Sequence, residues 1–359
     1  MKACLPPGPP RRPVRPGPRP APLPPRAGAG VRSVIRPGGG HLDPETAYAG
    51  ATRSAHRAGR LLWPADSLRR KALEIRRDII TMLVQAQSGH TGGPLSVTDV
   101  GTALFFHELN VDPADPAWPE RDFWHFSIGH VTPAIYSLMA ERGYFPLADL
   151  LGFRTFAGHL QGHPSRHDTP GIEVSSGSLG QGLSVCAGLA LAARMEAASA
   201  PGTPTRRVYC VLGDGEQQEG QVWEAAMFAG HRRLDNLCAV IDYNRKQIDG
   251  DVEDVCGIRP LADKWRAFRW NVVEVDGHDL EAILLAFAAA RAHRGAPTVI
   301  IAHTVMGKGV SFMEDDHRWH GKPPRPAEGE RALAELGTTF AAWSARLRAG
   351  DAGGNGAGP

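Results

Sequence analysis

A strand–loop–helix–strand unit in the middle of the chain constrains the fold more than any other feature. The apolar run 208–212 is typical of a strand buried on both faces of a parallel sheet, and it breaks abruptly at Gly-Asp-Gly, residues 213–215. The amphipathic segment 221–233 predicts a helix, and a second apolar run, 237–241, predicts a strand that leads to Asn244. Both polar clusters therefore fall at the carboxyl ends of strands, where ligands collect in open α/β sheets.

The polar groups at these two strand ends suit a divalent cation that holds a diphosphate. Asp214 offers a carboxylate oxygen and Asn244 an amide oxygen, and the flanking Gly213 and Gly215 let backbone N–H groups approach phosphate oxygens. Mg²⁺ prefers oxygen ligands and commonly takes several of them from phosphate and water. Gly-Asp-Gly alone is more often an ordinary turn, so the interpretation depends on the asparagine about 30 residues downstream.

Asp214 and Asn244 together resemble the thiamine diphosphate motif, which consists of Gly-Asp-Gly, a spacer of this size and a terminal asparagine. Tyr243 stands where the motif has a further asparagine, so only the ligating position is kept. The sequence from about residue 67 to 321 is similar to transketolases, and most closely to the N-terminal subunit of the split enzymes. The resemblance implies thiamine diphosphate and Mg²⁺ (or Ca²⁺ or Mn²⁺) as cofactors, with Asp214, Asn244 and the backbone carbonyl of Lys246 as metal ligands.

Four histidines match the transketolase pattern in four separate loops. His90 lies in Ser-Gly-His-Thr-Gly-Gly, His163 in Gly-His-Pro and His320 in Trp-His-Gly. The resemblance implies that these three act in catalysis beside the substrate, and an imidazole that titrates near neutral pH suits proton transfer. His130, in Gly-His-Val, matches a histidine near the diphosphate, which His320 also approaches.

Two further segments complete the set of residues that the resemblance implies. Residues 175–182 are similar to a loop whose backbone faces the aminopyrimidine ring of the cofactor, with Ser178 in place of a proline. Glu219 and Glu224 match glutamates that link paired active sites across a subunit interface, and Glu219 joins the catalytic set. An exposed helix carboxylate is the alternative for Glu224. The predicted cofactor-binding residues are His130, Gly177, Ser178, Leu179, Gly213, Asp214, Gly215, Glu224, Asn244 and His320.

The alternation of apolar runs with helical patterns predicts an α/β fold with a doubly wound, mostly parallel sheet and helices on both faces. Further strands are expected at 123–127, 271–275 and 297–302. The expected helices are 66–87, capped by Asp66; 97–107; 133–142; 182–195, apolar on nearly every side and therefore buried; 279–293; and 328–347.

Residues 1–60 differ in kind from the rest of the chain. They are rich in proline, arginine and glycine, and no acidic residue precedes Asp43. Such a segment buries too little apolar surface to offset the entropy of ordering it, which predicts disorder. A targeting peptide and a translation start placed too far upstream are the alternatives. The expected division is a disordered extension (1–60), the thiamine diphosphate-binding domain (61–348) and a flexible tail (349–359).

The bulk composition excludes some classes of partner. The chain has 359 residues and a formal net charge of +2, so its charge does not favour nucleic acid or a membrane surface. The five cysteines form no Cys-x-x-Cys pair, and Cys186, Cys210 and Cys238 lie in apolar runs typical of a protein core. This usage fits a reducing cytoplasm.

The expected partner follows from the resemblance. In full-length transketolases, the glutamate that activates the cofactor lies on a second, pyrimidine-binding domain, and this sequence ends at Pro359 without one. A separate C-terminal transketolase subunit should therefore supply it, with the active site at the interface of an α2β2 assembly.

The implied reaction is the transfer of a two-carbon ketol unit from a ketose phosphate to an aldose phosphate. The alternatives are a 1-deoxyxylulose-phosphate-synthase-like or another acyloin-forming thiamine enzyme, and a non-catalytic homologue. Ile128 and Val131 replace a polar residue and an alanine of the family near the pocket, which leaves room for a modified acceptor.

Deletion of residues 1–60 should leave folding and activity intact, because the extension has too few apolar side chains to contribute to a core. Thermal unfolding of the truncated chain, and its turnover with the partner subunit, check this. Loss of either property would show that the extension belongs to the folded domain.

Overall fold

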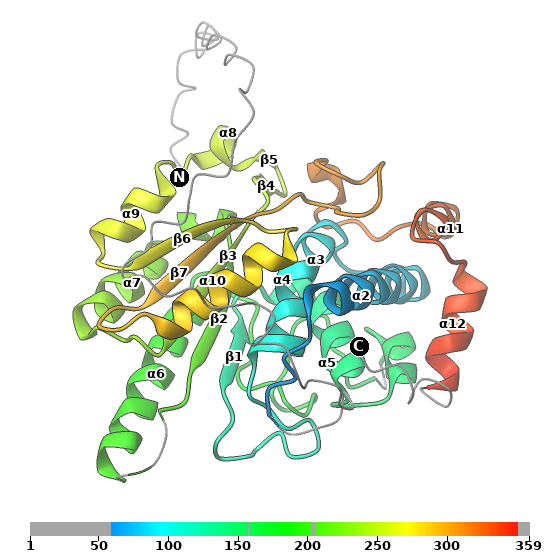
Figure 1. Ribbon diagram of the computed structural model, residues 1–359. Helices are drawn as coiled ribbons and strands as arrows, with labels where there is room; N and C mark the ends of the chain where they lie inside the picture. Colours follow the sequence, from blue (N-terminus) through cyan, green and yellow to red (C-terminus); the bar gives the residue numbers. More distant parts are fainter. Residues whose placement is uncertain (1–58, 157, 201, 203–204, 351–359) are drawn as a thin grey trace, which may run out of the picture. The chain divides into compact units, whose positions relative to one another are not determined.

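A parallel sheet of five strands forms the centre of the computed structural model, which describes residues 59–156, 158–200, 202 and 205–350 (Figure 1). The strands lie in the order β1–β2–β3–β7–β6, and each is parallel to its neighbours. They are β1 (Phe123–Phe126), β2 (Val208–Gly213), β3 (Leu237–Tyr243), β6 (Asn271–Asp276) and β7 (Thr298–His303). A short hairpin of β4 (Lys246–Gln247) and β5 (Gly250–Asp251) follows β3. The predicted parallel sheet is confirmed.

Alternate residues of each strand enter two different hydrophobic cores, because successive side chains of a strand point to opposite faces of the sheet. On β2, Tyr209 and Val211 pack into one core, and Cys210 and Leu212 pack into the other. The first core lies under α2 (Ala65–Ala86), α3 (Gly92–Ser96), α4 (Thr98–Ala103), α5 (Thr132–Arg142) and α10 (Leu280–Ala292). The second lies under α6 (Gly182–Ser199), α7 (Gly220–Arg232), α8 (Val252–Cys256) and α9 (Leu261–Ala267). Helices therefore cover both faces of the sheet, as the sequence predicts.

The helix α2 shows the predicted spacing but not the predicted cap. The predicted apolar positions Leu68, Ile75, Ile79 and Leu83 are fully buried, whereas Leu73 is exposed. The helix begins at Ala65 with Pro64 at the N-cap position, whereas Asp66 lies in the first turn. The Asp66 side chain accepts a hydrogen bond from Arg69 (2.5 Å) instead of capping a backbone N–H. The prediction of Asp66 as the cap was wrong because proline is well tolerated beside a helix start, where its missing N–H costs nothing.

Three other predicted helices differ from those observed. The segment 97–107 divides into α4 and a π-helical turn, Leu104–Glu108. The helix α6 is buried on one side only, since Gly188, Ala192 and Met195 are exposed. The segment 328–347 divides into α11 (Pro326–Glu335) and α12 (Phe340–Ala349), and between them Gly337 adopts φ +74°, a left-handed conformation that favours glycine.

Polar contacts attach the last helix, α12, to α2 and α5. The indole Nε1 of Trp343 donates a hydrogen bond to the buried carboxylate of Asp78 (2.7 Å), and Arg346 forms an ion pair with Glu141 of α5 (2.9 Å). Of the expected extension 1–60 and tail 349–359, residues 1–58 and 351–359 lie outside the described residues. Gly59 and Arg60 already bond to Val111 and Glu108, and Ala349 is the last residue of α12. None of the described helices combines the length and apolar character that a membrane crossing requires.

Gly230 and Gly188 form a matched pair for a test of packing. A Cβ on Gly230 in α7 would lie 2.0 Å from the carbonyl oxygen of Phe268, whereas a Cβ on Gly188 in α6 meets nothing within 4 Å. Alanine is favoured over glycine in a helix by up to about 1 kcal/mol, and forced overpacking costs roughly 1–3 kcal/mol or more. We therefore expect Gly230→Ala to lower the free energy of unfolding and Gly188→Ala to raise it slightly, as measured by urea denaturation. Equal effects of the two substitutions would contradict the packing described for α7.

Candidate active site

The ends of β2 and β3 bring the two predicted metal-binding side chains to one edge of the sheet. The pairing of the two strands continues to Gly213, the last residue of β2, which lies opposite Asp242. Oδ1 of Asp214 accepts the N–H of Gly215 (2.7 Å), and Oδ2 accepts the N–H of Arg245, the residue after Asn244. Asp214 and Asn244 are 2% and 6% exposed, so both lie at the bottom of the site. The predicted proximity of the two strand ends is observed.

Asp242, the penultimate residue of β3, fixes the orientation of the Asn244 amide. Nδ2 of Asn244 donates to Oδ2 of Asp242 and to Oγ of Ser96, both at 3.1 Å. Thr304 donates a hydrogen bond to the other carboxylate oxygen of Asp242. With its Nδ2 held in this way, the amide directs Oδ1 to the opposite side, where the N–H of Lys246 donates to it at 3.0 Å. The orientation of the Asn244 amide, whose oxygen is the predicted ligand atom, is therefore set by residues that the sequence did not single out.

The electrostatics of this edge fit a bound cation. Burial, with the nearby Asp242 as the next cause, raises the pKa of the Asp214 carboxyl to about 8. Its hydrogen-bond partners are neutral backbone N–H groups, so no side-chain cation among the described residues compensates its charge. A carboxylate and an amide oxygen are the donors that a hard divalent cation prefers. The described residues hold no group of three or more His, Cys, Asp or Glu arranged to hold a metal, so such an ion would also need backbone and ligand oxygens.

The side chain of Lys246 takes no part in this donor set. Its Nζ forms ion pairs with Asp251 (2.5 Å) and Asp315 (3.3 Å). The side chain is thus directed to the β4–β5 hairpin and to the segment after β7, and only the backbone of Lys246 lies beside Asn244. This arrangement agrees with a role for its carbonyl rather than for its ammonium group.

Three of the four predicted histidines form one cluster, although they are up to 230 residues apart in the sequence. The ring centroids of His90 and His130 are 5.1 Å apart, those of His130 and His320 are 5.1 Å apart, and those of His90 and His320 are 5.8 Å apart. Nδ1 of His90 and Nδ1 of His320 are buried and have no hydrogen-bond partner. Buried polar atoms without a protein partner commonly mark a ligand site, so both nitrogens are available to a cofactor or a substrate.

The histidines of this cluster are neutral at physiological pH. Burial, followed by the charge of His320, lowers the pKa of His90 to about 4 and that of His130 to about 3. Burial also lowers the pKa of His320. A neutral imidazole carries one N–H donor and one acceptor nitrogen, so it can take a proton from a hydroxyl or return one. The expectation that these imidazoles titrate near neutral pH is therefore not met by His90 and His130 in the chain alone, and the cluster offers neutral hydrogen-bonding groups without placing several positive charges together.

His163 and the loop 176–178 close the site from the side of β1. The ring of His163 lies beside Gly177, since a Cβ there would meet Cδ2 of His163 at 3.4 Å. Gly129 has no room for a side chain, because a Cβ would lie 2.8 Å from the backbone N of Gly177. Burial, followed by the charge of Arg154, lowers the pKa of His163. Gly177 and Ser178 are exposed and Leu179 is half-buried, so the backbone of this loop is accessible to a ligand.

Glu219 and Glu224 are both exposed on one side of α7 and its N-terminus. Glu219 lies at the N-cap position of α7, next to the loop 175–182, because a Cβ on Gly180 would meet its Cβ at 2.8 Å. Glu224 lies further along α7. Their exposure in the single chain leaves both carboxylates free for a partner surface, and their predicted roles stay predictions.

Sequence reasoning missed Glu216, which joins three segments of the site. Its buried carboxylate accepts hydrogen bonds from Ser127 at the end of β1, from the N–H of Gly180 (2.7 Å) and from the N–H of Gly213 (3.1 Å). It therefore fixes the end of β1 and the loop 175–182 against the Gly-Asp-Gly turn. The only signal in the sequence was a carboxylate directly after this turn, which is equally typical of an exposed loop.

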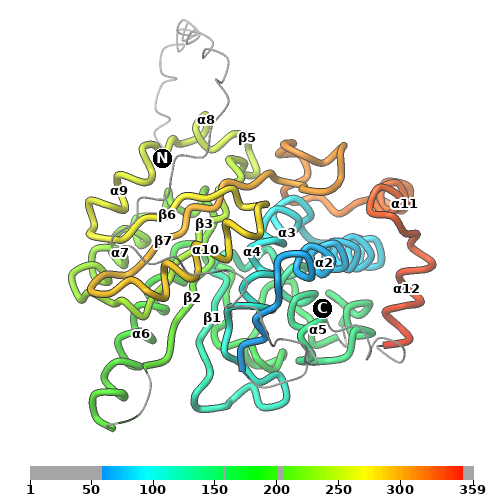
Figure 2. The backbone as a smooth tube through the Cα atoms, in the orientation of Figure 1, coloured from blue at the N-terminus to red at the C-terminus, as the bar shows by residue number. Residues whose placement is uncertain are grey.

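Residues 304–322, which we call the strap, lie between β7 and α11 in the sequence and pass beside α3 (Figure 2). The backbone N–H of Gly307 donates to the carbonyl of Gly92 (3.0 Å). The hydroxyl of Thr91 donates to the carbonyl of Lys322 (2.6 Å). The strap is thus fastened at both ends to the loop that carries His90, which brings His320 into the cluster.

The comparison with known protein families agrees with this geometry. The family model described as transketolase, thiamine diphosphate binding domain, matches residues 69–343. The chain belongs to the transketolase family. A 6-deoxy-6-sulfo-D-fructose transketolase subunit from Clostridium sp. (strain MSTE9) is 42% identical over 269 residues, which are 75% of this chain and 96% of that protein. An apulose-4-phosphate transketolase subunit from Actinobacillus succinogenes is 40% identical over 272 residues, 76% of this chain and 96% of that protein.

Solved transketolase structures share the fold. Transketolases from Leishmania mexicana and Campylobacter jejuni match with a TM-score of 0.73, at 31% and 32% identity, and cover 79% of this chain. The chain spans only 44% and 46% of those two chains. The predictions of a transketolase subunit, of a thiamine diphosphate-binding domain and of the corresponding α/β fold are therefore confirmed.

The pKa of Asp214 predicts a stability effect in the metal-free chain. Because this carboxyl binds its proton more tightly in the folded chain (pKa about 8) than in the unfolded chain (about 3.9), its contribution to stability falls as pH rises between these two values. From about pH 5 to about pH 8, Asp214→Asn should gain stability relative to the wild type by up to about 4 kcal/mol. Urea denaturation across this range measures the difference, with the exposed Asp249→Asn as the matched control. A constant difference between variant and wild type would contradict the buried, uncompensated carboxylate.

Proposed function

We propose that this chain is the diphosphate-binding half of a two-subunit transketolase, which moves a two-carbon ketol unit from a ketose phosphate to an aldose phosphate. The observation that supports this most is the convergence of the Asp214–Asn244 pair and the histidine cluster at one edge of the sheet, joined by the strap. Thiamine diphosphate, when bound, supplies the electron sink for cleaving a bond next to a carbonyl. The chain's own residues would bind, orient and exchange protons.

In this proposal the edge of the sheet holds Mg²⁺ and the diphosphate. Asp214, Asn244 and the carbonyl of Lys246 would be the protein ligands of the ion, and the N–H groups of the 213–215 turn would approach phosphate oxygens. His130 would lie at the phosphate end of the cluster. The backbone of residues 177–179 would face the aminopyrimidine ring, since it is the accessible part of that loop.

The remaining histidines would handle the protons of the substrate. His90 and His320 each have a buried Nδ1 without a protein partner, and His163 lies exposed beside the cluster. A neutral imidazole at each of these places can accept the proton of a sugar hydroxyl and return it, and such general acid–base catalysis contributes roughly 10²–10⁴-fold to a rate. Sugars present several hydroxyls, which matches a site with several imidazoles.

A cation beside the histidines favours an anionic substrate. Arg154 donates to Oγ of Ser88 (2.9 Å) and to the carbonyl of Gly162 (3.2 Å), and its charge lowers the pKa values of both His90 and His163. Sugar phosphates meet this requirement. The named relatives act, by their names, on a sulfonated and on a phosphorylated sugar, which are anionic as well.

A partner subunit is the other part of the proposal. The exposed side of α6 and α7 carries Met195, Met227 and Phe228, which are 61%, 56% and 42% exposed, together with Glu224. Exposed large apolar side chains commonly mark a subunit contact, and Met227 and Phe228 follow Glu224 by three and four residues on α7. We propose that a C-terminal subunit with the pyrimidine-binding domain completes the active site, and that two such pairs form an α2β2 assembly in the cytoplasm.

Reconstitution of the two subunits tests this function. The chain with its partner, thiamine diphosphate and Mg²⁺ should convert xylulose 5-phosphate and ribose 5-phosphate, or a sulfonated or branched sugar in their place, whereas each of the two by itself should show little turnover. Removal of the metal with a chelator should abolish cofactor binding, and Asp214→Ala should do the same, because the ion loses its only carboxylate ligand.

The control reaction is pyruvate with glyceraldehyde 3-phosphate. Turnover of that pair, with none of the ketose phosphates, would favour a 1-deoxyxylulose-phosphate-synthase-like enzyme. Robust activity of the lone chain would contradict the two-subunit proposal. Absence of thiamine diphosphate binding by the reconstituted pair would leave a non-catalytic homologue.

A further inference from the structure

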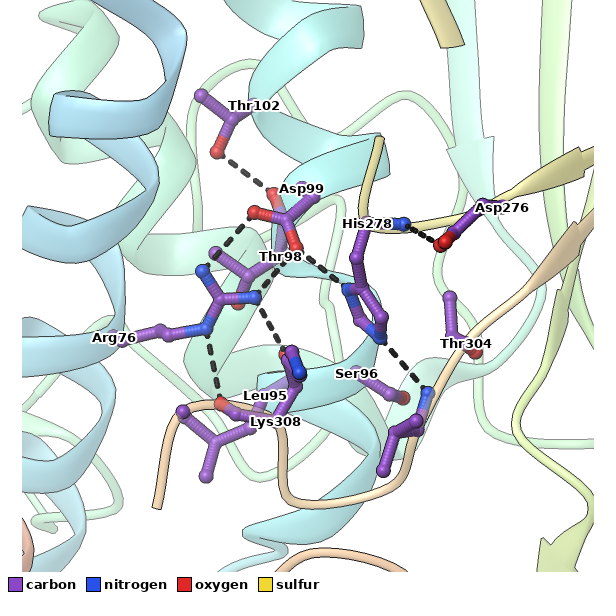
Figure 3. Close-up of polar contacts among 12 residues, drawn as sticks. Arg76, Leu95, Ser96, Thr98, Asp99, Thr102, Asp276, His278, Thr304 and Lys308 are labelled. Atoms are coloured by element: carbon purple, nitrogen blue, oxygen red, sulfur yellow. Dashed lines mark hydrogen bonds and ion pairs between the residues drawn. The ribbon is translucent and has the colours of Figure 1, made fainter. Parts of the chain in front are cut away.

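A buried polar network holds the first part of the strap in place (Figure 3). Its centre is Asp99 of α4, whose two carboxylate oxygens accept hydrogen bonds from Arg76 of α2 at 3.0 and 2.7 Å. Nδ1 of His278, in the turn between β6 and α10, lies 2.7 Å from Oδ2 of the same carboxylate. Arg76 and Asp99 are 8% and 6% exposed, so the network lies inside the protein.

The network ends on the main chain of the strap and not on its side chains. The backbone N–H of Val305 donates to Nε2 of His278 (2.9 Å), and Nε of Arg76 donates to the carbonyl of Lys308 (3.0 Å). Because Nε2 of His278 accepts a hydrogen bond, the ring proton must lie on Nδ1 and point to Asp99. One carboxylate thereby orients both groups that hold the strap.

The carboxylate at the centre of the network stays ionised over the working range of pH. Burial raises the pKa of Asp99, but the Arg76 guanidinium and the hydrogen bond from His278 outweigh this and hold it at about 2. Asp99 is therefore ionised, and it compensates the buried charge of Arg76. Asp276 forms a hydrogen bond with the backbone N–H of His278 (2.9 Å), which fixes the turn that carries the ring.

The strap connects this polar network to the histidine cluster through contacts with Gly92. Between the two contacts of the network, Gly307 bonds to the carbonyl of Gly92, and Met306 packs against Gly92 so closely that a Cβ there would lie 2.5 Å from Cγ of Met306. Gly92 is two residues from His90, and the carbonyl of Trp319, next to His320, would lie 3.2 Å from the same Cβ. A shift of residues 305–308 would therefore change the position of His90 relative to His320.

We propose that Arg76, Asp99 and His278 are positioning residues, which hold the strap in its binding geometry before any cofactor arrives and so set the separation of His90 and His320. The effect of the ordered strap on cofactor binding rests on the proposed transketolase activity. The ordering of the strap by these three residues does not depend on that proposal. None of the three residues touches the cluster, so they act through the strap. Contacts to the backbone fix the register of the strap whatever side chains stand at 305 and 308.

Two substitutions of His278 each remove one of the two hydrogen bonds that its ring forms, one to Asp99 and the other to the backbone of Val305. The amide of asparagine reaches the position of Nδ1, so His278→Asn keeps a donor for Asp99 and loses the acceptor for Val305. The amide of glutamine reaches the position of Nε2, so His278→Gln keeps an acceptor for Val305 and loses the donor for Asp99. His293→Gln, at the C-terminal cap of α10 near the opposite edge of the sheet, is the matched control.

The measurement is hydrogen exchange of the full chain without cofactor or partner. The amides of Val305 and Gly307 should be protected in the wild type and in His293→Gln. In His278→Asn they should exchange about 10-fold faster, the loss expected for one backbone hydrogen bond, and His278→Gln should restore part of the protection. Amides of β3 should keep their protection in all variants. Wild-type exchange in both His278 variants, or equal loss of protection in β3, would overturn the proposal.

A binding experiment with thiamine diphosphate and Mg²⁺ then tests the consequence for the site. With the partner present, His278→Asn should bind the cofactor roughly 10-fold more weakly by quenching of tryptophan fluorescence, while kcat at saturating cofactor stays close to the wild-type value. Lost protection with unchanged cofactor affinity would overturn the positioning role. Failure of the wild-type pair to bind thiamine diphosphate would instead overturn the proposed function, and the exchange result would still decide whether the triad orders the strap.

Discussion

The interaction on which the site depends is the parallel pairing of β2 with β3. Because the two strands end in register, two buried carboxylates, Asp214 and Asp242, meet at one edge of the sheet. Like charges in a protein interior repel strongly, so each needs its own compensation. Asp242 has hydrogen-bond donors from Ser96, Thr304 and Asn244. Asp214 has only backbone N–H groups, and burial together with the nearby Asp242 raises its pKa to about 8.

The rest of the site is built from loops that the sheet alone does not position. The loop of His90 and the strap of His320 are held together by backbone contacts at Gly92 and Thr91, and the loop 175–182 is held by Glu216. Close approach at Gly92 and Gly129 depends on the absence of a side chain. Glycine thus has a steric role at these two positions, where main chain from a distant segment lies within van der Waals contact.

The strands, the strand-end pair and the four histidine loops could be predicted because each carries a local signal: an apolar run, a polar break, or a motif that resembles the family. The apolar pattern of the segment 182–195 predicted a helix correctly but did not show which of its faces are buried. A helix face in an interface and a helix face in the core have the same apolar composition. Glu216 and His278 could not be found in this way. Their roles come from hydrogen bonds to groups 36 and 27 residues away, and no local pattern encodes such a contact.

The distribution of charge over the site argues for an obligatory cation. A diphosphate that approached the strand ends would meet the buried carboxyl groups of Asp214 and Asp242, whose pKa values are raised, and the neutral cluster of His90 and His130 offers no positive charge to attract it. The cation beside the cluster, Arg154, is engaged with Ser88 and the loop of His163 rather than with the strand ends. In the proposed function, an ion held by Asp214 would supply the electrostatic attraction at the sheet edge. In the proposed function, the cofactor therefore binds only when the metal is present. The metal binds first, because it is held by Asp214, the buried carboxyl group that the sheet brings to this edge.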